Sequence, residues 1–165
     1  MKNNPKKESE KQIDFNLIRS QNIFPEKGRM IEIPDYGEIG AGKVVPFSKE
    51  RKKIKVPKPS NAHDGDILFA HRVSGDSLNN LTDPDKNIRN GDSLICKANC
   101  ELREITPDKI CIVFISQTCE SLAKHVILNG DYVILRSTNP HYPDRRFPAD
   151  VVEIKGLVLG YKRMF

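Results

Sequence analysis

The stretch Val73-Ser74-Gly75-Asp76-Ser77 determines how the rest of the chain is interpreted. It follows the apolar run from Ile67 to Ala70, so a strand is expected to end in a turn of small residues. Glycine permits sharp backbone geometry, and a hydroxyl group on such a turn can act as a nucleophile beside amides that face an oxyanion. The same residues are also ordinary turn formers, so the choice depends on the sequence before and after them.

Most of the chain after Met30 consists of short apolar runs separated by Gly, Pro, Asn and Asp. This pattern is mostly β and has almost no long helical period, which predicts a barrel-like domain or one of folded sheets. Asn129-Gly130 is a strong signal for a hairpin turn. Strands are expected at 30–33, 39–45, 54–56, 67–73, 93–98, 110–116, 121–128, 132–136 and 151–161.

Residues 1–29 are expected to form a flexible N-terminal arm ahead of a single domain that spans residues 30–165. Residues 1–12 are polar and rich in lysine, which is typical of disorder. Residues 13–24 contain enough apolar side chains for a short amphipathic helix or a docking segment, but not for two packed helices. A helix-turn-helix DNA-binding domain is therefore not expected before Met30.

The net charge of +5 is unevenly distributed. Residues 43–58 carry seven basic side chains and a single acidic one, Glu50. Such a run could contact nucleic acid or an acidic partner, or it could be a solvated loop. Its lysine-rich part has no interleaved aromatic residues for base stacking, which favours the solvated loop and leaves direct DNA binding undecided.

Composition also limits the cellular compartment and the kinds of metal or cofactor site that can be expected. No apolar run approaches the roughly 20 residues that cross a bilayer, so a cytoplasmic protein without membrane contact is expected. The four cysteines, Cys96, Cys100, Cys111 and Cys119, match no zinc-binding spacing. Reduced thiols are therefore expected, with no metal site and no cofactor.

A serine nucleophile needs a base, and the residues offer two kinds. None of the four histidines has an evident acidic partner, so a Ser-His-Asp triad is possible but unsupported. Lys124 is the alternative, because alternation in the strand 121–128 places it on one face with Leu122, Val126 and Leu128. From the pattern alone, this lysine either extends outward to solvent or is desolvated and neutral.

Several motifs, taken together, resemble the self-cleaving LexA/UmuD-type peptidase family. They are Ala41-Gly42, Val73–Ser77, Asn90-Gly91-Asp92, Ala123-Lys124-His125 with its Asn129-Gly130 hairpin, the run Leu135–Tyr142 and the closing run Val152–Val158. Their order agrees with the family over about residues 30–165. Leu78 departs from the methionine that usually follows the serine in this family, and the connections 78–91 and 100–108 look longer than usual.

The resemblance implies a LexA-like peptidase domain and a serine peptidase with a Ser-Lys dyad that cuts its own chain. Ser77 would be the nucleophile and Lys124 the neutral general base, with backbone amides near Asp76 and Ser77 as oxyanion donors. Ala41-Gly42 would be the scissile bond, and cleavage should accelerate as the pH rises toward about 10. The short arm is similar to the UmuD-like branch, in which cleavage releases an arm in a DNA-damage (SOS) response.

The same resemblance implies partners. These are a second copy of the chain in a homodimer, the RecA–single-stranded DNA filament as activator, and an error-prone DNA polymerase. Two other functions remain open. One is a non-catalytic, repressor-like or polymerase-accessory binding module, and the other is a trans-acting Ser-Lys protease similar to signal peptidases.

Overall fold

The computed structural model describes residues 25–40 and 52–163, with side chains from Arg29 onward in the first range. The expected disorder at 1–12, the expected helix or docking segment at 13–24, the Ala41-Gly42 bond and the first half of the basic run lie outside these residues. Within the described residues the fold is mostly β, as predicted. The strands are β1 Pro25–Gly40, β2 Lys52–Pro59, β3 Leu68–Ser74, β4 Ser93–Lys97, β5 Ile110–Ile115, β6 Glu120–Asn129, β7 Tyr132–Arg136, β8 Arg145–Pro148 and β9 Val152–Lys162.

Three short 3₁₀ helices occur in the connections: η1 Pro84–Lys86, η2 Leu102–Glu104 and η3 Ala149–Val151. The sequence pattern did not predict β8, whose four residues include two arginines and a proline. The expected hairpin is present between β6 and β7, with Asn129 paired to Tyr132 and Gly130 at a φ of 61°.

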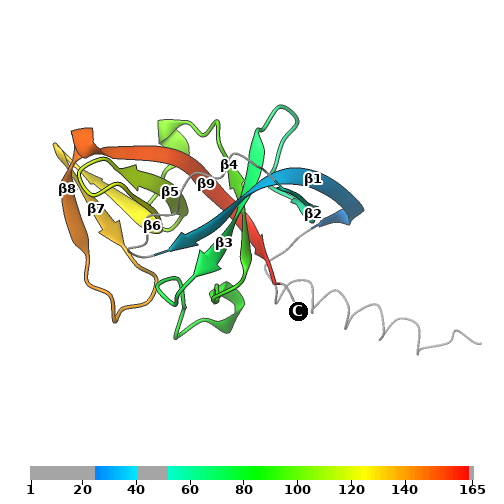
Figure 1. The fold of residues 1–165 in the computed structure, drawn as a ribbon, viewed down its shortest axis with the longest axis horizontal. Coiled ribbons are helices and arrows are strands. Elements are labelled where there is room, and N and C mark those ends of the chain that lie inside the picture. The colour runs from blue at the N-terminus through cyan, green and yellow to red at the C-terminus, as the bar shows by residue number, and fades with distance from the viewer. Residues whose placement is uncertain (1–24, 41–51, 164–165) are drawn as a thin grey trace, which may run out of the picture.

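The strands form one sheet, in the order β2-β1-β3-β4-β9-β5-β6-β7-β8 across the described residues. All pairings are antiparallel except β1 with β3. Figure 1 shows the strands in two groups, β1–β4 on one side and β5–β8 on the other, with β9 crossing between them. The first half of β9 pairs with β5 and the second half with β4, so this strand joins the two groups.

The fold at the crossing of β9 depends on Gly156. A Cβ atom there would lie 2.6 Å from Cζ of Phe69 and 3.1 Å from the carbonyl oxygen of Lys97. Glycine therefore lets β9 pass close to β3 and β4 where it changes partner. Phe69 packs in one core cluster with Leu94, Ile112 and Tyr161, so this cluster spans both groups of strands.

Strand β1 is longer than the sequence pattern indicates, because it is one continuous strand where two were expected. Residues 30–35 pair with β2, and residues 35–40 pair with β3, with a register shift after Asp35. Pro34 falls within the part paired with β2, just before the pairing with β3 begins.

Candidate active site

Ser77 lies just beyond β3, in the turn that the sequence singled out. Gly75 has a φ of 100°, a conformation that favours glycine, and its amide donates to Oδ1 of Asn90 at 2.8 Å. The amide of Gly91 donates to the carbonyl of Val73 at 2.8 Å, so the turns 73–77 and 90–92 are held together. The Ser77 residue is buried, with an exposed fraction of 6%.

Lys124 lies in β6 and is 4% exposed, which resolves the question that the pattern left open. Leu122 and Val126, two residues before and after it, are buried in the core cluster of the β5–β8 group. The side chain of Lys124 is therefore desolvated and does not extend to solvent. Burial lowers the pKa of Lys124 from 10.5 to about 8, with a further lowering from the charge of Arg145 and an opposing effect from Glu120.

The loop between β7 and β8 contacts both predicted catalytic residues. Nζ of Lys124 donates to Oγ of Ser137 at 2.6 Å. Two residues further on, the amide of Asn139 donates to the carbonyl of Ser77 at 3.0 Å. Ser77 and Lys124, 47 positions apart in the sequence, thus border the same loop.

The same loop fixes the peptide groups around Ser77. Nδ2 of Asn139 donates to the carbonyl of Asp76 at 3.1 Å, and the hydroxyl of Tyr142 donates to the Asp76 carboxylate. In a trans peptide the N–H points opposite to the C=O, so the Ser77 amide is directed away from Asn139. The Ser77 N–H is one of the two amides expected to act as oxyanion donors, a role that stays a prediction. The ring centroid of Tyr142 also lies 5.5 Å from Nζ of Lys124.

Sequence reasoning did not assign roles to Ser137, Asn139 and Tyr142. All three lie in the run Leu135–Tyr142, which was recognised as similar to the family but was not connected to the site. Asn139 is 3% exposed, and Ser137 is 7% exposed. Buried polar residues in a run with turn-forming Asn and Pro were the available signal.

The end of β1 reaches the site from the other side. Ile39 pairs with Val73 and Gly40 pairs with Ser74, three positions before Ser77. A Cβ atom on Gly40 would lie 2.6 Å from the carbonyl oxygen of Ser74, so the two backbones are closely apposed. Strand β1 also contacts β6, the strand of Lys124, and Figure 1 shows the tip of β1 directed toward the β5–β8 group.

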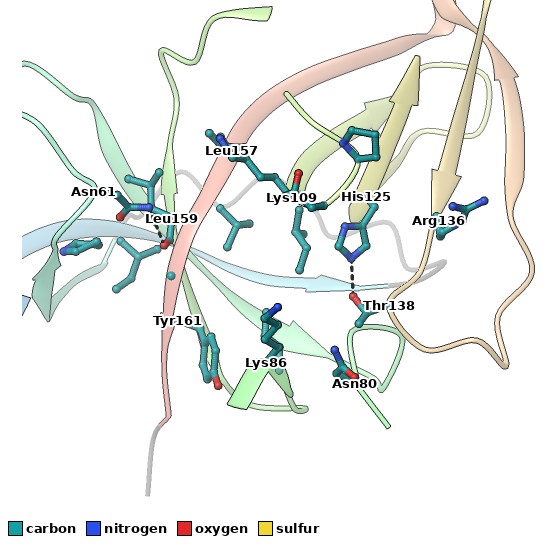
Figure 2. A pocket seen from close by; sticks show the side chains of 18 of the residues that line it. Asn61, Asn80, Lys86, Lys109, His125, Arg136, Thr138, Leu157, Leu159 and Tyr161 are labelled. Carbon is teal, nitrogen blue, oxygen red and sulfur yellow. Dashed lines mark hydrogen bonds between the residues drawn. The ribbon is translucent and has the colours of Figure 1, made fainter. Parts of the chain in front are cut away.

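A cavity of about 690 Å³ lies next to this site. Ser137 lines it, together with His125, Thr138, Ile110 and Tyr161. Figure 2 shows His125 directed toward Thr138, whose Oγ1 lies 2.8 Å from Nε2 of the histidine. Ser77 and Lys124 do not line the cavity, so it adjoins the candidate dyad and does not contain it.

The histidines have other partners in the described residues. Nδ1 of His71 lies 3.2 Å from the carbonyl oxygen of Gly37, and His125 contacts Thr138. Burial lowers the pKa of both. His63 and His141 are exposed, and no histidine side chain is hydrogen-bonded to Ser77 in the described part of the chain. This arrangement does not support a Ser-His-Asp triad.

The cysteines form no disulfide, and Cys111 lies directly opposite Lys124 in the register of β5 and β6. Cys96 and Cys111 are buried, and all four cysteines are unbridged. Burial raises the pKa of Cys111 to about 12. Within residues 25–40 and 52–163 there is no group of three or more His, Cys, Asp or Glu that could hold a metal ion. In the same residues, no helix is long and apolar enough to cross a membrane.

Comparison with known proteins identifies the family to which the sequence of this chain belongs. Residues 34–159 match the family described as Peptidase S24-like. The chain is 31% identical over 137 residues to the LexA repressor of Pelagibacter ubique, covering 82% of this chain and 56% of that protein. It is 27% identical over 154 residues to the LexA repressor of Gluconacetobacter diazotrophicus, covering 92% of this chain and 56% of that protein.

A third relative, the LexA repressor of Syntrophobacter fumaroxidans, is 27% identical over 150 residues, which cover 91% of this chain and 67% of that protein. The chain thus spans little more than half the length of the first two relatives. Because the family match extends from β1 to β9 and includes both Ser77 and Lys124, the chain belongs to the Peptidase S24-like family of LexA/UmuD-type serine peptidases.

Proposed function

We propose that this protein is a self-cleaving regulator that cuts its own Ala41-Gly42 bond with a dyad of Ser77 and Lys124. The observation that carries the proposal is the buried Lys124, which has a lowered pKa and is tied by one loop to the turn of Ser77. A surface lysine would be protonated at neutral pH and could not accept a proton. A desolvated lysine can.

The reaction follows from these roles. Neutral Nζ of Lys124 removes the proton from Oγ of Ser77 as that oxygen attacks the carbonyl carbon of Ala41. Amides near Asp76 and Ser77 stabilise the oxyanion of the tetrahedral intermediate. When the intermediate collapses, the C–N bond to Gly42 breaks and Lys124 returns its proton to the leaving amine. Water then hydrolyses the ester on Ser77.

Cleavage within one chain is supported by the position of β1. This strand runs parallel to β3 and ends at Gly40 against Ser74, one residue before the proposed scissile bond. The peptide segment of the same chain is therefore held at high effective concentration near the nucleophile. A trans-acting protease would instead bind an added peptide beside β3, where β1 of the same chain is already paired as far as Ser74.

A DNA-binding module without catalysis is less well supported. Part of the basic run, residues 52–58, lies in β2 and does not form the solvated loop. Lys55 is directly opposite Glu32 in the register, and Lys52 is opposite Asp35. These acidic neighbours offset the positive charge that a nucleic-acid surface would require.

The biological setting is part of the proposal. The printed names of the relatives are those of LexA repressors. By that likeness we assign this protein to an SOS-type response in the cytoplasm, as a homodimer whose cleavage the RecA–single-stranded DNA filament promotes. An error-prone DNA polymerase is the proposed downstream partner. Addition of the filament should raise the cleavage rate of the wild-type protein and leave Ser77→Ala uncut.

Intact-protein mass spectrometry tests the catalytic assignment. The purified chain is incubated at mildly alkaline pH beside Ser77→Ala and Lys124→Ala. The wild type should give two fragments that meet between Ala41 and Gly42, and both variants should remain intact. Lys109→Ala is the control, because this lysine lies near β5 and outside the dyad. Equal cleavage of wild type and the Ser77 variant would eliminate the dyad.

A further inference from the structure

Strand β1 is built into the sheet that carries the candidate active site. Its first part is paired with β2 from Met30 to Asp35, and its last part with β3 from Asp35 to Gly40. Both partners follow the proposed scissile bond in the sequence. Cleavage between residues 41 and 42 would therefore cut the chain between β1 and the two strands that hold it.

The side chains of β1 also contribute to two hydrophobic clusters. Ile33 is 4% exposed and packs with Val56, Ala70 and Ile95. Ile39 is 1% exposed and belongs to the cluster that includes Leu78, the residue after Ser77. Removal of β1 would expose both clusters to water, which is unfavourable.

An aromatic contact adds to this packing. The rings of Tyr36 and Phe69 meet edge to face, with their centroids 5.4 Å apart. Phe69 in turn contacts the position of Gly156 in β9. Strand β1 therefore packs against the region where β9 crosses between the two groups of strands, and its side chains are part of the core.

We infer that β2 and β3 form a strand-binding site whose occupant after self-cleavage is the protein's own N-terminal fragment, held through residues 25–40. This inference rests on the proposed function. Peptide-bond cleavage and separation of the fragments are then two distinct events. The cut leaves a nicked but folded protein, and release of the fragment requires β1 to unpair from the sheet.

The first experiment compares native and denaturing conditions on the self-cleaved full chain at about 1 μM. A denaturing gel should show two fragments, whereas native mass spectrometry should show one species that contains one N-terminal fragment for each C-terminal fragment, each such pair having the mass of the intact chain plus one water. Two separate species under native conditions would overturn the inference. Absence of any cut on the denaturing gel would count against the proposed function only.

A second route tests retention without the dyad. In Ser77→Ala, residues 43–48 are replaced by the recognition sequence of a site-specific protease, which then nicks the chain after β1. The fragments should again remain together under native conditions. Their separation would overturn the inference whether or not the wild type cleaves itself.

Matched variants in this nicked protein identify the basis of retention. Ile33→Ala and Ile39→Ala should each weaken fragment association by about tenfold or more, because each removes a buried aliphatic side chain. Glu38→Ala is the control, since Glu38 is exposed on the same strand. Thermal melting before nicking shows that each variant is folded. Equal loss of association in Glu38→Ala and the isoleucine variants would refute the role of the packed face.

Discussion

The pH dependence of self-cleavage provides the sharpest test of Lys124 as the base. Burial lowers the pKa of this lysine from 10.5 to about 8. At pH 7, a group with a pKa of 8 is neutral in about one molecule in ten, whereas an unperturbed lysine is neutral in about 0.03% of molecules. The lowered pKa, which is due first to burial and then to the charge of Arg145, thus raises the population of the reactive form about 300-fold at neutral pH.

The expected rate profile follows from these populations. The cleavage rate should rise about tenfold from pH 6 to pH 7, about fivefold from pH 7 to pH 8, and level off above about pH 9. The family resemblance alone predicted acceleration toward pH 10, because it was based on an unperturbed lysine. First-order rates from intact-mass spectra at half-unit intervals of pH distinguish the two profiles. A rate that still climbs tenfold per unit between pH 9 and 10 would refute desolvation of Lys124.

Two neighbouring charges provide an internal check. Arg145 lowers the pKa of Lys124 and Glu120 raises it, and these two residues form an ion pair at 2.9 Å. Arg145→Gln should therefore move the midpoint of the profile to higher pH, and Glu120→Gln should move it to lower pH. Shifts of both variants in the same direction would contradict the electrostatic account.

Three further outcomes are expected. Ser137→Ala removes the hydrogen-bond acceptor of Lys124, so the plateau rate of cleavage should fall about tenfold and the midpoint of the pH profile should move to lower pH. Ser137→Thr keeps the hydroxyl group and should retain most activity. An unchanged profile in the alanine variant would exclude this positioning role. Gly40→Ala places a methyl group against Ser74 and should slow cleavage about tenfold or more in the same mass assay, whereas Glu38→Ala should not. Lys124→Met should raise the melting temperature above that of Ser77→Ala by about 4 °C or more at pH 7, because the folded protein no longer buries a group that is protonated when unfolded. Because the unfolded chain binds more protons between pH 8 and 10.5, this difference should shrink over that window, and a constant difference would show that it has another cause.

The sequence predicted most of the strands because their apolar runs and turn residues are local signals. It also predicted that Lys124 lies in a strand, but alternation cannot distinguish a buried lysine from one that extends to solvent. That distinction depends on the β7–β8 loop, which packs on the site through Ser137 and Asn139. Such contacts join residues far apart in sequence, and no local pattern encodes them.

Strand β1 shows the same limit for the fold. Its prolines and glycines suggested two short strands with a turn between them, whereas the structure has one strand that changes partner at Asp35. Local sequence propensity cannot reveal a change of partner strand, because each half of β1 is hydrogen-bonded mainly along one edge. The parallel pairing with β3, which brings Gly40 to Ser74, could not be predicted from spacing.

The crossing strand β9 has a consequence for the order of events during protein synthesis. Ser77 follows a strand of the β1–β4 group and Lys124 lies in the β5–β8 group, and among the described strands only β9 is hydrogen-bonded to both. A ribosome makes β9 after the other described strands. A nascent chain can therefore contain Ser77 and Lys124 before it contains the strand that joins the β1–β4 group to the β5–β8 group. The proposed self-cleavage would thereby be withheld from chains that lack β9, and the protein would become competent to cut itself only once β9 has been translated and inserted.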